Sequence, residues 1–153
     1  MAFYDNVDAV KKQRLGTRKR DLAQNEYIYL QGIASTAIGS WVNFDGGVAF
    51  VTALLDTDVA ATQLGRLAVA KAAVGASQYG WYCIYGAVDG LALTGSTDAK
   101  NAFATATAGS VDDSGVGAEV LVNGAWSTGA VNETTFLQAF AISYPYMHGL
   151  TLD

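Results

Sequence analysis

Short apolar runs separated by glycine-rich turns make up most of the chain after residue 26. Each run is four to eight residues long, a length typical of strands rather than helices. The run 66–71 alternates with the period of a strand and places Leu67 and Val69 on one face, and we expect it to neighbour 81–85. The predicted strands are 27–30, 41–44, 48–55, 66–71, 81–85, 86–93, 102–108, 119–122 and 137–144.

Turn signals and two ambiguous stretches separate these strands. The pair Asp45-Gly46 tolerates the positive φ angles that tight hairpins require. Thr57 could cap a short helix in 56–64, and 70–76 is rich in alanine. We favour strand and loop for both stretches, because glycines recur there at intervals shorter than a normal helix. These glycines are Gly65, Gly75 and Gly80.

The strand pattern predicts an all-β fold. About seven to nine short strands with this density of turns indicate a small β-barrel or a jelly-roll-like sandwich. Long helical patterns, which parallel βαβ units need, are too few. The chain has 153 residues, which suits one compact domain.

Charge divides the chain near residue 26. Six of the nine basic residues lie between positions 11 and 20, and the whole chain has a net charge of −5. We therefore predict an extended basic N-terminal arm, residues 1–26, attached to an acidic β-rich body, residues 27–153. The basic residues of the arm are Lys11, Lys12, Arg14, Arg18, Lys19 and Arg20.

Three interpretations of the arm are open at this point. It could attach the protein to a partner, it could be a solvated charge run at a frayed terminus, or it could bind nucleic acid. Nucleic acid is the least favoured partner, because no aromatic residues interleave the bases and the chain as a whole is acidic. Separately, the charged fraction of the whole chain, 15% against roughly 25% in typical domains, indicates assembly with another subunit, since a surface poor in charge tends to be covered by a partner.

Few residues carry recognisable chemistry. Cys83 has no cysteine to pair with and lies in an apolar run, and His148 is the single histidine. Asp112-Asp113 could bind a hard cation such as calcium, but the run is also an ordinary turn. We therefore predict no enzyme, no cofactor and no metal site. The chain also shows no signal peptide and no apolar segment long enough to cross a membrane, so no membrane partner is expected.

Aromatic residues form the last group of candidate functional residues. In a strand, Trp81, Cys83 and Tyr85 lie on one face, and Tyr82 and Ile84 on the other. Such a strip can stack a sugar or a base, but the acids and amides that would bind sugar hydroxyls do not accompany it. A core or subunit contact is therefore favoured. The candidate core or subunit-interface aromatics are Trp41, Tyr79, Trp81, Tyr82, Tyr85 and Tyr144.

Several motifs, taken together, resemble a known family. They are NEYIYLQG at 25–32, GSWV at 39–42, ASQYGWYCIYG at 76–86, VDD at 111–113 and YP at 144–145. In this combination they are similar to the small decoration, or cement, proteins of tailed-bacteriophage heads. The resemblance covers about residues 15 to 146, and SQYGWY at 77–82 is its most specific part.

The resemblance implies a structural virion protein without enzymatic activity. Such proteins lie on the outer surface of the capsid, commonly as homotrimers at three-fold or quasi-three-fold positions, where they bind the major capsid protein and stabilise the shell against internal DNA pressure. It also implies that residues 1–26 contact the capsid. The alternative is a head-fibre or tail-associated protein that binds a glycan through Tyr79, Trp81 and Tyr82. A hydrolase that uses Asp112 and Asp113 is the least favoured interpretation.

Overall fold

The computed structural model describes residues 2–45, 48–56, 65–115 and 120–148. Within them the chain forms a single sheet of eleven strands, and every strand ladder is antiparallel. The one helix among the described residues is the three-residue 3-10 helix η1 (Phe3–Asp5). The prediction of an all-β fold is thus confirmed.

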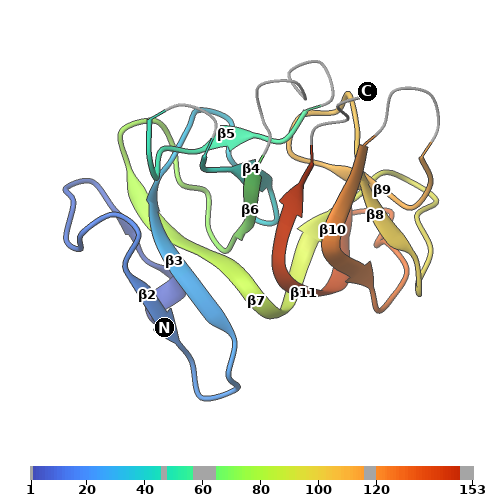
Figure 1. The fold of residues 1–153 in the computed structure, drawn as a ribbon, viewed down its shortest axis with the longest axis horizontal. Helices are drawn as coiled ribbons and strands as arrows, with labels where there is room; N and C mark the ends of the chain where they lie inside the picture. The colour runs from blue at the N-terminus through green and yellow to red at the C-terminus, as the bar shows by residue number, and fades with distance from the viewer. Residues whose placement is uncertain (1, 46–47, 57–64, 116–119, 149–153) are drawn as a thin grey trace.

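Eight strands follow one another across the sheet (Figure 1). In spatial order they are β2 (Arg18–Arg20), β3 (Glu26–Gln31), β7 (Tyr79–Leu91), β6 (Gly65–Ala70), β11 (Leu137–Met147), β10 (Val120–Ser127), β8 (Asn101–Ala104) and β9 (Val111–Asp112). The three other strands are β1 (Val7–Asp8), which pairs with β7, and β4 (Trp41–Asn43) and β5 (Ala53–Leu54), which continue from β6. The sheet is not closed, and two isolated parallel bridges join Gln31 to Val51 and Ala92 to Val111.

The strand number exceeds the predicted seven to nine because the sequence analysis missed three short strands. Strands β1, β2 and β9 have only two or three residues, too few to show a period in the sequence. The merger of 81–85 and 86–93 into the single strand β7 offsets part of this excess. Strand β11 also continues past Pro145, where the register with β10 shifts and the ladder can tolerate a residue without an N–H.

Some expectations about loops lie outside the described residues, namely the Gly46 turn and positions 57–64. The ambiguous stretch 70–76 contains no helix, which agrees with the preference for strand and loop. Of the predicted strand 48–55, only Ala53–Leu54 is a strand. No helix within the described part of the chain is long and apolar enough to cross a membrane.

The alternation of side chains between the two faces of β7 changes phase near Gly86. Before this position the odd-numbered Trp81 and Cys83 contribute to the larger hydrophobic cluster, and after it the even-numbered Val88 and Ala92 do so. Gly86 has φ +108°, a conformation that residues with a Cβ rarely adopt. One long strand can therefore contribute to the core in both halves of the sheet.

The core contains side chains from both faces of β7. Trp81 and Cys83 pack in the larger cluster with Tyr29, whereas Tyr82 and Ile84 pack in a second cluster. Strand β6 alternates in the same way, with Leu67 and Val69 in the larger cluster and Ala68 and Ala70 in the second. The predicted faces of β6, those of Trp81 to Ile84 in β7, and the pairing of the two strands through Val69 and Cys83 are confirmed. Tyr85 was predicted on the face of Trp81 and Cys83, but it is exposed beside Tyr144, because the register between β3 and β7 shifts between Glu26 and Tyr27.

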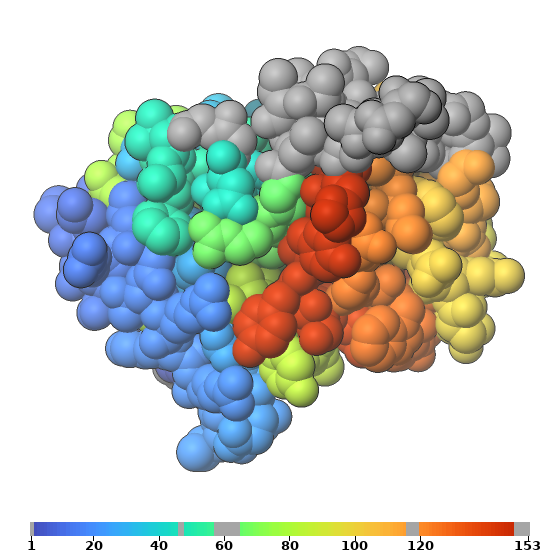
Figure 2. Space-filling view, in the orientation of Figure 1, coloured from blue at the N-terminus to red at the C-terminus, as the bar shows by residue number. Residues whose placement is uncertain are grey.

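The basic N-terminal segment lies on the sheet and is not a projecting arm (Figures 1 and 2). The Phe3 ring packs edge-to-face on Trp81 at 5.2 Å, and Tyr4 stacks on Tyr27 at 4.6 Å between ring centroids. Val7 pairs with Gly80, and β2 forms a hairpin with β3. The apolar residues that attach this segment are few and follow no period, so the sequence pattern did not indicate their burial.

Candidate functional site

Strand β2 forms one end of the strand order, and among the described strands it pairs only with β3. The hairpin that joins them is held by the Asp21 carboxylate, which accepts hydrogen bonds from the Asn25 backbone N–H at 3.0 Å, the Asn25 amide at 2.9 Å and the Tyr27 hydroxyl at 3.0 Å. Gln24 supplies the left-handed residue of the turn, with φ 67°. A short strand of three exposed basic residues is thereby fixed at the sheet edge.

The carboxylate of Glu26 positions the two arginines of β2. Arg20 donates from Nε at 3.1 Å and approaches through Nη2 at 2.9 Å, both to Glu26 Oε2, and Arg18 Nη1 lies 3.4 Å from Oε1. The Tyr144 hydroxyl donates to Oε2 at 3.0 Å. Glu26 is only 6% exposed, and these donors replace the hydrogen bonds that its carboxylate would otherwise make to water. The hydrogen bond to Glu26 also raises the pKa of the Arg20 guanidinium.

Two exposed tyrosines lie beside the arginines. The Arg18 guanidinium is 6.0 Å from the Tyr144 ring centroid, and the Arg20 guanidinium is 5.9 Å from that of Tyr85. The two rings are 5.4 Å apart and are 38% (Tyr85) and 43% (Tyr144) exposed. We refer to Arg18, Arg20, Tyr85 and Tyr144 as the arginine–tyrosine patch. Arginine and tyrosine are the residue types that most often dominate protein–protein interfaces.

Lys19 points to the opposite face of β2. Its Nζ lies 5.5 Å from the Phe3 ring centroid and 5.3 Å from that of Trp81, within the range of a cation–π contact. This placement helps to cover Trp81, which is only 4% exposed. The three basic residues of β2 are therefore divided, two on one face and one on the other.

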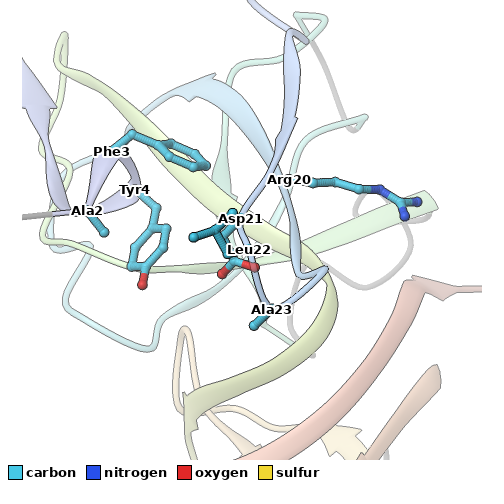
Figure 3. A pocket seen from close by; sticks show the side chains of 7 residues that line it. All are labelled: Ala2, Phe3, Tyr4, Arg20, Asp21, Leu22 and Ala23. Atoms are coloured by element: carbon cyan, nitrogen blue, oxygen red, sulfur yellow. The ribbon is translucent and has the colours of Figure 1, made fainter.

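An open hollow lies beside the hairpin, on the side of η1 (Figure 3). Its volume is about 540 Å³, and Phe3, Tyr4 and Leu22 supply its large apolar side chains. Leu22 is fully exposed, although the loop that carries it is held by Asp21. Figure 3 shows the Arg20 guanidinium directed away from Phe3 and Tyr4. Sequence reasoning overlooked this hollow because its residues come from two short segments without a periodic pattern.

The other three basic residues of the segment are not on β2. Lys11, Lys12 and Arg14 lie in the loop between β1 and β2, where all three are exposed. Lys12 forms an ion pair with Asp8 at 3.0 Å. The predicted set of six therefore separates into an ordered edge strand and a loop.

The aromatic residues predicted together have different environments. Trp41 and Tyr82 are fully buried, Trp81 is nearly so, and Tyr79 is partly buried and stacked on Tyr29 at 6.3 Å. The glycan-stacking strip of Tyr79, Trp81 and Tyr82 is therefore not an accessible surface. Both faces of β7 at residues 81–84 are covered by the chain itself, which a period of two cannot reveal.

The remaining candidates for chemistry contact neighbouring groups of the fold. Burial raises the pKa of the Cys83 thiol to about 12, so this cysteine stays protonated at neutral pH. Asp113 Oδ2 accepts hydrogen bonds from the Thr97 hydroxyl at 2.7 Å and its N–H at 2.9 Å, and the Asp113 N–H donates to Asp112. No group of three metal-ligating side chains was found among the described residues. His148 packs edge-on against Tyr146.

Acid should weaken the fold through its carboxylates. Burial raises the pKa of Asp21, but hydrogen bonds from Asn25 and Tyr27 outweigh it, so the pKa lies below its ordinary value of 3.8. Stability contributed by such a group is present above its unfolded-state pKa and is lost as the pH falls through its folded-state pKa. The pKa is lowered likewise in Asp8, Asp45, Asp113 and Glu133.

We therefore expect the urea midpoint to decrease as the pH falls below about 4. The Asp21→Asn variant should have a lower midpoint at pH 7 and a shallower decrease in acid, because one of the titrating carboxylates is absent. Urea unfolding of both proteins at several pH values measures this. An unchanged pH dependence in the variant would show that Asp21 does not stabilise the hairpin.

Comparisons of the chain with models of protein families, with curated proteins and with solved structures each found no match.

Proposed function

We propose that this protein is a capsid decoration protein of a tailed bacteriophage, which binds the outer surface of the head and stabilises the shell. The observation that carries the proposal is the arginine–tyrosine patch at the edge of an all-β body. The motif resemblance gives the class of partner, the major capsid protein. The patch gives a surface through which such a protein could attach.

The patch has the charge and the rigidity of an attachment surface. Arg18 and Arg20 share the single carboxylate of Glu26, so this face retains one net positive charge on a chain whose total charge is −5. Each guanidinium has five N–H donors, and Glu26 occupies only some of them. Because Glu26 and the tyrosine rings already orient the arginines, little side-chain entropy is lost when an acidic surface binds.

Several copies on one shell would strengthen a weak contact. If the protein forms a homotrimer, as the resemblance implies, three patches bind at high effective concentration. The charge complementarity predicts that attachment weakens as salt increases. Trimer formation and attachment are separable properties, and light scattering on the isolated protein measures the first.

A coating experiment tests the proposal. Empty heads assembled without this protein are incubated with wild type, with Arg18→Gln/Arg20→Gln and with Lys11→Gln/Arg14→Gln, and the bound protein is quantified after sedimentation. We expect the first variant to bind at least about tenfold more weakly, because two interface arginines are lost. The second variant removes the same charge from the neighbouring loop and should bind nearly as well as wild type.

Arg18→Gln alone provides a control for folding, since it leaves the shorter Arg20–Glu26 contacts in place. It should bind with intermediate affinity. Equal weakening by both double variants would indicate general charge attraction instead of the patch. Failure of the wild-type protein to coat heads would overturn the decoration function itself.

A further inference from the structure

The outer side of β2 has main-chain groups that point away from the sheet. The Tyr29 N–H donates to Thr17 O at 2.9 Å, and the Asp21 N–H donates to Asn25 O at 3.0 Å. Between these pairs, Lys19 lies opposite Tyr27. Hydrogen-bonded pairs alternate along an antiparallel ladder, so Lys19 bonds to β3, and the N–H and C=O groups of Arg18 and Arg20 face outward.

The β2 edge differs from an edge strand whose charged side chains only prevent pairing with another strand. Charged side chains on an edge strand can prevent unwanted pairing when they extend over the exposed backbone. Here Glu26 and the tyrosine rings draw the arginines to one face, and Phe3 and Trp81 draw Lys19 to the other. The side chains are thus held to the two sides of the strand, and the backbone edge between them stays accessible.

An added strand would meet a different surface on each face. Side chains on one face would meet the arginine–tyrosine patch, which favours acidic groups. Side chains on the other face would meet Lys19 and the apolar hollow of Phe3, Tyr4 and Leu22 (Figure 3). Because successive residues of a strand point to opposite faces, the best occupant alternates acidic and apolar residues.

We infer that the β2 edge binds, by strand addition, an extended segment of the partner protein that alternates acidic and apolar residues. The inference rests on the proposed function for the identity of the partner, which would be the shell protein. A second copy of β2 is a poor occupant, since it would bring Arg18, Lys19 and Arg20 against the same three positive charges.

Two synthetic peptides of equal composition test the inference. Ac-Thr-Glu-Val-Glu-Val-Glu-Thr-NH₂ has the alternating pattern, and Ac-Thr-Glu-Glu-Glu-Val-Val-Thr-NH₂ has the same charge without it. Titration of each peptide into the labelled protein is followed by NMR. We expect the alternating peptide to bind at least about tenfold more tightly, and Arg18→Gln/Arg20→Gln to remove most of the difference.

Amide hydrogen exchange supplies a readout that simple charge attraction would not change. In the unbound protein the Lys19 amide should be protected and those of Arg18 and Arg20 should exchange quickly. The alternating peptide should slow exchange at Arg18 and Arg20 and leave Lys19 unchanged. The same peptide with N-methylated glutamates cannot form the ladder on that edge and should lose this protection.

The possible outcomes separate this inference from the proposed function. Equal binding of the two peptides, or binding without protection of Arg18 and Arg20, would overturn strand addition. If heads are coated but these amides still exchange quickly in the bound protein, the decoration function stands and the inference is wrong. If the alternating peptide binds with protection but heads are not coated, the edge recognises such a strand and the assignment of its partner fails.

Discussion

Replacement of Trp41 by alanine is expected to lower the free energy of unfolding by about 3–5 kcal/mol, a large part of the roughly 5–15 kcal/mol that stabilises a domain. Trp41 is fully buried on β4. Its ring packs edge-to-face on Phe140 of β11 at 5.1 Å, and its indole nitrogen lies so close to Gly90 of β7 that a Cβ there would overlap it. The side chain therefore joins three strands of the larger cluster, and its removal leaves a cavity among them.

Trp126→Ala is the matched control. Trp126 lies on β10 and is 47% exposed, so its loss should cost much less, on the order of 1 kcal/mol. Urea unfolding at pH 7 compares the two variants. Trp41→Phe adds a second comparison, because the buried indole N–H has no hydrogen-bond partner among the described residues. Similar losses for Trp41→Ala and Trp126→Ala would contradict the burial of Trp41.

Replacement of Gly86 by alanine should cost roughly 2–4 kcal/mol, since positive φ and steric overlap both oppose the new methyl group. Gly86 has φ +108°, and its Cβ would overlap the Asn25 side-chain oxygen. That oxygen accepts a hydrogen bond from the Ala87 N–H at 3.0 Å. The substitution should therefore disturb both the kink of β7 and the hairpin that carries the basic edge.

The Gly95→Ala variant separates the cost of the positive φ angle from the cost of the steric overlap. Gly95 has φ +80°, but a Cβ there would meet no atom within 4 Å, so this variant should lose only about 1 kcal/mol through backbone strain. Thermal or urea unfolding of both variants measures the difference. If Gly86→Ala and Gly95→Ala lose equal stability, the contact with Asn25 is relaxed by movement of the hairpin, and the close fit at the kink is not required.

The candidate site shows where sequence reasoning succeeded and where it failed. The concentration of basic residues was visible in the sequence, and three of them do form one strand. Their organiser, Glu26, was not visible as such, because it lies at the start of a strand and is bonded by Tyr144, 118 positions away. Tyr85 and Tyr144 come together because Tyr85 lies opposite Ser143 in the β7–β11 ladder, and no local pattern encodes that pairing.

The sequence by itself determined the all-β class, the faces of β6 and the faces of residues 81–84 in β7, because alternation with a period of two is a property of consecutive residues. It also determined that positive charge gathers in residues 11–20. Only the tertiary structure decided that this segment belongs to the sheet, since the contacts that bury it join Phe3 and Tyr4 to Tyr27 and Trp81. These contacts are long-range packing, whose energy depends on which surfaces meet and not on the order of residues along one strand.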